Sequence, residues 1–166
     1  MVEIIAEKAY ELGKKYEYDY RGCSQCVIAA LQDAFDMKND DIFKSATGLT
    51  GGGCQETDGS CGAYVGAIMI LSFLVGRGRD KFDDPEGIRY RAGDLARKLH
   101  DRYIQEYGSV ICRNIQTKLM GRPFYIADPD EREKFLQAGA HEVHCPEVVG
   151  KVARWMAEII LEKNLL

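Results

Sequence analysis

Cysteine is the residue type with the greatest chemical potential in this sequence. A thiolate is both a nucleophile and a soft metal ligand, so cysteines that meet in a fold can do redox or metal chemistry. A chain of 166 residues normally buries a stable core without disulfide bonds. We therefore expect a chemical role for the cysteines rather than a role as structural crosslinks. The six are Cys23, Cys26, Cys54, Cys61, Cys112 and Cys145.

Four of the six cysteines occur where helices are expected to start. Unpaired backbone amides and the positive end of the helix dipole favour a thiolate over a thiol at such positions. The alternative is that each cysteine is only a small buried apolar residue. Four coincident placements favour the chemical role. They are Cys23 after Gly22, Cys61 after Gly59-Ser60, Cys112 after Gly108-Ser109, and Cys145 before Pro146.

Cys26 and Cys54 extend the possible ligand set. Cys23-Ser24-Gln25-Cys26 is a CxxC sequence, which suits a redox dithiol or half of a metal site. A thioredoxin-type motif requires a strand before it, and a zinc ribbon requires a second CxxC; the sequence supplies neither. Ligands of one site must therefore converge from separate helices.

His141 and His144 precede Cys145 in an HxxHC cluster that could bind zinc or iron. We favour ordinary loop histidines here, so His144 is a secondary metal candidate. The sequence contains no CxxCH, and covalent c-type haem is not expected. The glycines at 51–53 predict a turn that lets the backbone approach Cys54 and Cys61.

The elements that must position these residues are helices. Apolar residues recur at three-and-four spacing, and no segment alternates as a strand does. We predict an all-α, compact bundle of about five to seven helices, forming a single domain over 1–166. The segment 61–75 is apolar on every side, which predicts a buried central helix. Gly62 and Gly66 leave one side of it bare, so that a backbone or a cofactor can approach Cys61. The expected helices are 2–16, 23–36, 61–75, 86–107, 130–138 and 147–163, with a short helix beginning near Cys112.

Charge and hydropathy exclude several functional classes. The chain has 22 Lys and Arg against 26 Asp and Glu, a net charge of -4, and no basic footprint for nucleic acid. Its first residues lack the features of a secretory signal, which predicts a cytoplasmic protein. The uncharged segment 59–76 is interpreted as a core helix rather than a membrane span, so we do not expect an integral membrane protein.

The ordered motifs of the chain resemble those of a known family. They are GCSQCVIAAL, GLTGGG, SCGAYVGAIM, ICRNI and HCPEVVGKVARWMAEII, which together are similar to the redox-active proteins named for four cysteines and a CGAxxG motif (C_GCAxxG_C_C). The similarity extends over about 20–160. It assigns the CGAxxG motif to 61–66 and the other family cysteines to Cys23, Cys112 and Cys145. Cys26 and Cys54 depart from the four-cysteine pattern.

The family is in turn similar to a domain of split-Soret cytochrome c, a dimeric electron-transfer protein. The resemblance thus implies a redox partner protein, whose identity it does not give, and a homodimer as the candidate oligomeric state. The haem function is not carried over, because the haem-attachment motif is missing from this sequence.

The leading hypothesis is electron transfer or redox sensing through an iron-sulfur cluster or another metal centre. The first candidates for redox-active and metal-binding residues are Cys23, Cys61, Cys112 and Cys145, which we predict to meet at one end of the bundle. Further cofactor-binding candidates are Cys54, Cys26, Gly62 and Gly66. One alternative is thiol-disulfide exchange without metal, by Cys23/Cys26 or Cys54/Cys61. Another is a zinc-stabilised binding module, and whether the protein is an oxidoreductase or only an electron carrier stays open.

Overall fold

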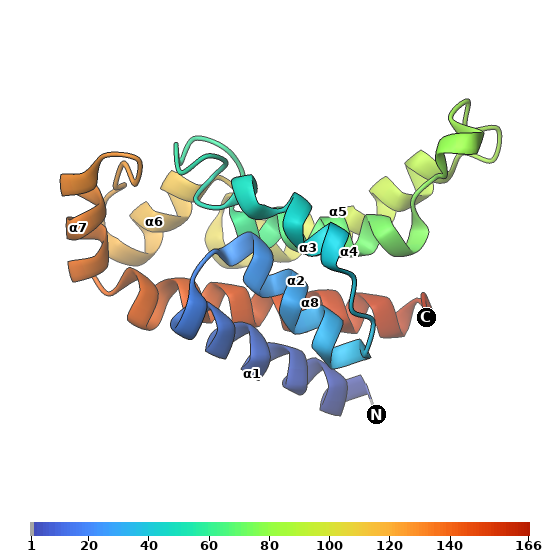
Figure 1. The fold of residues 1–166 in the computed structure, drawn as a ribbon, viewed down its shortest axis with the longest axis horizontal. Coiled ribbons are helices and arrows are strands. Elements are labelled where there is room, and N and C mark those ends of the chain that lie inside the picture. The colour runs from blue at the N-terminus through green and yellow to red at the C-terminus, as the bar shows by residue number, and fades with distance from the viewer. Residues whose placement is uncertain (1) are drawn as a thin grey trace.

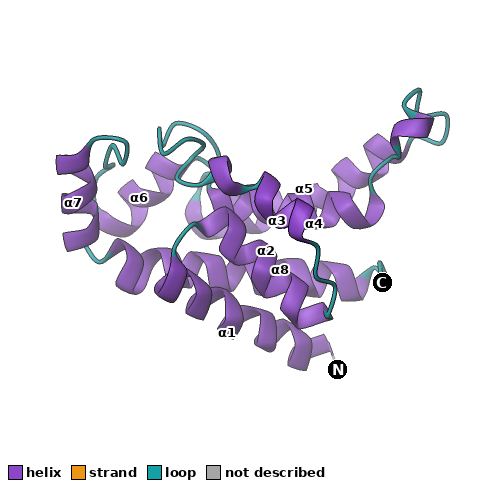
Figure 2. Ribbon diagram, in the orientation of Figure 1, coloured by secondary structure: helices purple, strands orange, loops and turns teal. Residues whose placement is uncertain are grey.

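Helices account for the fold. The computed structural model describes residues 2–166 and contains, within them, eight α-helices and no strand (Figure 2). The all-α class predicted from the sequence is confirmed. The helices are α1 (Val2–Tyr20), α2 (Cys23–Phe35), α3 (Asp40–Ser45), α4 (Gly62–Val75), α5 (Ile88–Tyr107), α6 (Cys112–Met120), α7 (Pro129–Gln137) and α8 (Cys145–Glu162). The short helices η1 (Thr47–Leu49) and η2 (Arg79–Lys81) are of 3-10 type, and η3 (Ala140–His144) is a π-helix.

The last helix, α8, is the centre of the bundle. It packs against α1, α2, α4 and α5. Helix α1 runs along it for most of its length, and both chain termini lie at the same end of the molecule (Figure 1). At the opposite end, α6, α7 and the start of α8 come together. The buried face of α8 follows the spacing seen in the sequence, with Val148, Val149, Val152, Met156, Ile159 and Ile160 in the core.

The predicted buried central helix therefore exists, but it is α8 rather than the helix at 61–75. The first half of α4 is buried, whereas Phe73 near its end is 52% exposed. A uniformly apolar sequence does not say which side its neighbours will cover, and here α2, α5 and α8 pack on α4 but leave Phe73 near its end exposed. None of the helices in the described part of the chain has both the length and the apolar character needed to span a membrane.

Capping residues explain where several helices start. Asp128 accepts a hydrogen bond from the backbone N–H of Glu131 (2.9 Å) and Pro129 opens α7, as the sequence predicts. Helix α5 begins two residues later than predicted, because Gly87 adopts a left-handed conformation after Asp84-Pro85-Glu86. The sequence analysis missed α3, which has only six residues and is capped by Asn39.

Helix α1 is longer than predicted, and its extra turn matters for the site. It continues to Tyr20 instead of ending at residue 16. The buried residues of α1 are Ala6, Ala9, Gly13 and Glu17, which lie along one face. A Cβ on Gly13 would be 3.0 Å from the Val149 carbonyl oxygen, so this face packs closely on α8. The close packing carries Glu17 into the interior next to the start of α8.

Replacing Gly66 with alanine should destabilise the bundle. A Cβ at this position would lie 2.3 Å from the Ser24 carbonyl oxygen in α2. Helices α2 and α4 would have to separate, so we expect the free energy of unfolding to fall by roughly 1–3 kcal/mol. Urea denaturation followed by circular dichroism measures this change.

The matched control is Gly93→Ala in α5, where a new Cβ meets nothing within 4 Å. Alanine is the better helix former by up to about 1 kcal/mol, so this variant should be as stable as the parent protein or more stable. Equal stability of the two variants would show that α2 and α4 do not pack this closely.

Candidate functional site

The starts of α4 and α6 are joined by backbone hydrogen bonds. Ser60 and Ile111 form an isolated antiparallel bridge. The Cys61 N–H donates to the Val110 carbonyl at 2.7 Å, and the Cys112 N–H donates to the Gly59 carbonyl at 3.0 Å. This short pairing places two cysteines that are 51 positions apart in the sequence at neighbouring helix starts.

The glycine-rich turn before this bridge packs on Cys112. Gly52 has a φ of 78°, and a Cβ there would lie 2.9 Å from the Cys112 Cβ. Only glycine fits both this backbone conformation and this close approach. The sequence analysis expected the turn to bring the backbone near Cys54 and Cys61; it is Cys112 that the turn contacts.

The start of α2 lies against the start of α4. A Cβ on Gly62 would be 2.5 Å from the Cys23 Sγ, which places Cys23 directly beside the CGAxxG motif. Helix α2 thus packs against the side of α4 that Gly62 and Gly66 leave bare. The close approach expected there is made by a backbone, that of α2. Cys23 also lies 3.5 Å from the Thr50 hydroxyl.

The four helix-start cysteines line one cavity of about 420 Å³. The cavity lies at the end of the bundle where α6, α7 and the start of α8 meet. Its other candidate donors are Glu17, His141 and His144, and apolar side chains from α6, α7 and α8 form much of the remaining wall. The four are Cys23, Cys61, Cys112 and Cys145, and all six cysteines of the chain are free thiols. Residues from 17 to 149 therefore converge on a single space.

Cys26 and Cys54 do not line this cavity. The buried Cys26 thiol donates to the Arg21 carbonyl oxygen at 3.1 Å. Cys54 is exposed in the glycine-rich loop. A residue three positions after Cys23 on a helix lies on nearly the same face, but the two cysteines line different pockets. Cys26 instead contributes to a second, shallower pocket with Tyr16, Ala29 and Phe43.

The cavity cysteines fall within a region that matches a known protein family. A model described as "Putative redox-active protein (C_GCAxxG_C_C)" matches residues 22–159. The chain belongs to this family. The matched range contains all four cavity cysteines of this C_GCAxxG_C_C protein and excludes Glu17. No curated protein and no solved structure matches the chain.

All four family cysteines lie at helix starts, as predicted, but one start differs from the others. Cys23 and Cys112 are first residues of α2 and α6, and Cys61 directly precedes α4. Cys145 begins α8 immediately after the π-helical turn η3, and its N–H donates to the Ala140 carbonyl. Because the helical hydrogen bonds continue through this turn, Cys145 does not face a free helix end.

The electrostatics of the metal-free cavity oppose the thiolate that the helix starts were expected to favour. Burial raises the pKa of Cys112 from 9.0 to about 12, which corresponds to roughly 4 kcal/mol. Burial, followed by the negative charge of Glu17, raises the pKa of Cys145 well above its usual range. For Cys23, a hydrogen bond with Cys61 comes first and burial second, and both raise the pKa. A helix start stabilises an anion by only about 0.3–1 kcal/mol, so burial outweighs it.

The sequence analysis missed Glu17 and did not select His141 as a metal ligand. Glu17, His141 and Cys145 each offer a ligand atom, and these atoms lie within 4.8 Å of one another. The spacing of Ala6, Ala9 and Gly13 with Glu17 was the available signal, because it puts a carboxylate on the apolar face of a helix. The predicted end of that helix at residue 16 concealed it.

Proposed function

We propose that this C_GCAxxG_C_C protein transfers single electrons or senses redox state through an iron-sulfur or other metal centre held by Cys23, Cys61, Cys112 and Cys145. The observation that supports this function is the convergence of these four cysteines on one cavity. Such a centre, when bound, exchanges single electrons at a potential set by hydrogen bonds and by exposure to solvent.

The donor chemistry of the cavity fits a thiophilic metal centre. Four soft sulfur donors match the ligand number of common iron-sulfur clusters and of structural zinc sites. Buried thiolates need a compensating positive charge. Among the described residues of the cavity wall, the only basic side chains are Arg21, Arg132 and the two histidines. A metal ion supplies that charge directly and deprotonates the thiols it binds.

Neighbouring groups of the chain would tune and shield the centre. The Gln116 amide donates to the Cys112 Sγ at 3.5 Å, while its oxygen accepts from the Phe124 N–H at 2.7 Å. This second bond holds the amide in the orientation that presents its N–H to sulfur. Ile115 and Val148 on the cavity wall limit access of water to the sulfur atoms.

A thiol-disulfide function is the second candidate, and one observation favours it. Cys23 and Cys61 line the same cavity, and Cys61 is the largest cause of the raised pKa of Cys23, so a disulfide would join these two rather than the pairs Cys23/Cys26 or Cys54/Cys61 suggested by the sequence. The raised pKa of Cys23 opposes this function, because exchange proceeds through the thiolate.

Iron and sulfide analysis of anaerobically purified protein tests the proposal. We expect iron and acid-labile sulfide in stoichiometric amounts and a visible charge-transfer spectrum. Cys61→Ser should lose most of the iron, while its metal-free form changes in stability by roughly 1 kcal/mol or less. Cys112→Ser should show the same loss of iron.

The matched control is Cys54→Ser, which makes the same substitution at an exposed cysteine outside the cavity and should keep its iron. Protein that contains no iron but gains two titratable thiols on reduction would support the disulfide function instead. Stoichiometric zinc without iron would support a zinc-stabilised module. Either result would contradict the electron-transfer proposal.

A further inference from the structure

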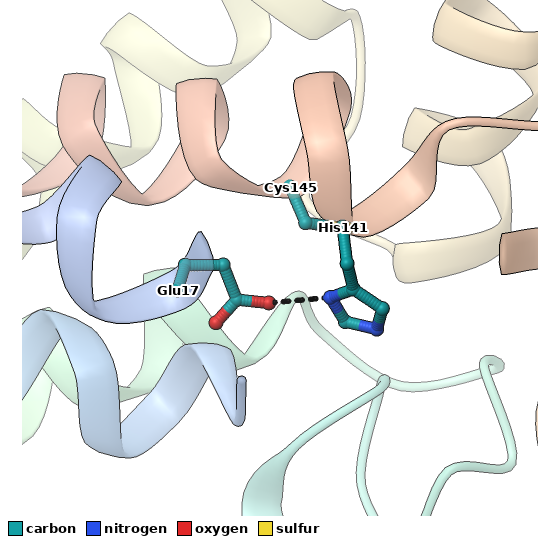
Figure 3. A group of neighbouring side chains, drawn as sticks. All are labelled: Glu17, His141 and Cys145. Atoms are coloured by element: carbon teal, nitrogen blue, oxygen red, sulfur yellow. Dashed lines mark hydrogen bonds and ion pairs between the residues drawn. The ribbon is translucent and has the colours of Figure 1, made fainter. Parts of the chain in front are cut away.

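A second group of donor atoms lies where α1 meets the start of α8. The Glu17 carboxylate points toward the His141 ring, with Oε1 of Glu17 3.1 Å from Nδ1 of His141 (Figure 3). Cys145 projects from the next turn of the chain, and the three ligand atoms lie within 4.8 Å of one another. This group combines oxygen, nitrogen and sulfur donors, unlike the all-sulfur set described above.

The unpaired oxygen of Glu17 indicates that this group is incomplete without a ligand. Glu17 is 1% exposed, and its Oε2 has no hydrogen-bond partner among residues 2–166. Buried carboxylate oxygens are nearly always hydrogen-bonded or bound to a cation, because removing them from water is costly. Glu17 lines the cavity, so a cation there would satisfy it.

Two local features of the backbone hold these residues together. The last turn of α1 carries Glu17 into the interior, as its close packing on α8 requires. The π-helical turn η3 presents both His141 and Cys145 to the same cavity. Single π turns are rare and are frequently found at functional sites.

We propose that Glu17, His141 and Cys145 form a mixed-donor site for one borderline divalent cation, of the class of Zn²⁺ and Fe²⁺. Metal-ligand bonds of about 2.0–2.3 Å in tetrahedral geometry put ligand atoms about 3.3–3.8 Å apart, so shifts of about 1 Å in the side chains complete the site. Three protein ligands leave a fourth position for water or another ligand. His144 lines the same cavity.

This site goes beyond the four-cysteine centre and does not depend on it. It requires Cys145 but none of Cys23, Cys61 and Cys112. The two sites can be filled together only if the Cys145 thiolate bridges them. The mixed-donor site therefore stands or falls on its own measurement.

A cobalt titration isolates the mixed-donor site. The variant Cys23→Ser/Cys61→Ser/Cys112→Ser removes the other cavity thiols, and Co²⁺ reports bound sulfur and nitrogen through its charge-transfer and ligand-field absorption. We expect one Co²⁺ per chain with a cobalt-thiolate band. Adding Glu17→Gln should weaken binding by about 100-fold or more, since loss of a ligand exceeds the 10- to 100-fold effect of removing an outer-shell partner.

The matched control is Glu142→Gln, which makes the same change at an exposed neighbour of His141 and should leave cobalt affinity unchanged. Equal affinity of the Glu17→Gln and Glu142→Gln proteins would overturn the proposal. If the triple variant binds cobalt while the parent protein proves free of iron and sulfide, the mixed-donor site survives and the electron-transfer function fails.

A measurement on the unmodified cysteine set covers the case in which the triple variant does not fold. Imidazole ¹⁵N signals of the full chain are recorded at saturating Zn²⁺. We expect a ring nitrogen of His141 to shift on metal binding, and this shift to disappear in Glu17→Gln but not in Glu142→Gln. An unchanged His141 signal at saturation would refute the mixed-donor site.

Discussion

The affinity of the metal-free protein for Zn²⁺ should rise at least about a thousandfold for each pH unit between about pH 6.5 and 8.5. Metals bind the thiolate, so every thiol that is protonated before binding releases one proton. Cys23, Cys112 and Cys145 all have raised pKa values, that of Cys112 about 12. Three released protons give a factor of about 10³ per pH unit. Competition with a chromophoric chelator, corrected for protonation of the chelator, measures the slope.

Calorimetry in two buffers of different ionisation enthalpy counts the released protons independently. In Cys112→Ser the slope should decrease by about one factor of ten per pH unit, because one ionising ligand has been removed. Cys54→Ser, at an exposed position outside the cavity, should keep the full slope. A slope near zero in the parent protein would mean that thiolates form before the metal arrives, and that the helix starts outweigh burial.

The metal-free protein should lose stability as the pH rises above about 8.5. An unfolded thiol has a pKa of about 8.5, whereas the folded state holds its buried thiols protonated to higher pH. The stabilisation is therefore fully present below about pH 8.5 and is lost as the pH rises above it. Raised pKa values occur at Cys23, Cys26, Cys112 and Cys145.

Each fully shielded thiol would lower the free energy of unfolding by about 1.4 kcal/mol per pH unit above 8.5. Three of the four line a cavity that admits solvent, so screening reduces the total to roughly 2–3 kcal/mol at pH 9.5. Urea denaturation at pH 7.5 and 9.5, with a chelator and a non-thiol reductant, measures it. The upper limit of pH 9.5 keeps the buried tyrosines Tyr103 and Tyr107 protonated, because burial raises their pKa values too.

The Cys112→Ser protein should lose less stability between these two pH values than the Cys54→Ser protein. Equal stability of the parent at pH 7.5 and pH 9.5 would show that its cavity thiols ionise as ordinary exposed thiols do. That outcome would also flatten the pH dependence of metal affinity above about pH 8.5, where ordinary thiols are already ionised, so the two experiments test one electrostatic cause through opposite signs.

Local sequence determined most helices of this protein and the placement of four cysteines at helix starts. Apolar spacing marks the buried face of α8, and Asp128-Pro129 marks the start of α7, because both depend on residues within one or two turns of each other. The helix starts at Cys23, Cys61 and Cys112 follow from the same short-range rules. Together with the ordered motifs, they led to the C_GCAxxG_C_C family without knowledge of the fold.

The tertiary structure alone decided which donors share the cavity. Cys26 follows Cys23 by three residues, yet its thiol donates to the Arg21 carbonyl oxygen and does not line the cavity. Glu17 enters the site only through the extra turn of α1 and its packing on α8. The contact of Glu17 with His141 joins positions 124 residues apart, so the spacing along α1 can place Glu17 on an apolar face but cannot identify its partner.

The pKa values of the thiols also could not be predicted from the local sequence. Sequence position places a cysteine at the end of a helix dipole, which stabilises a thiolate by about 1 kcal/mol at most. The thiols become buried only when α1, α2, α4, α6 and α8 pack around one cavity. For Cys112, burial opposes ionisation several times more strongly than the helix dipole favours it. The chain itself specified where its thiols begin helices, and the docking of those helices buried Cys23, Cys112 and Cys145 so that their pKa values are raised.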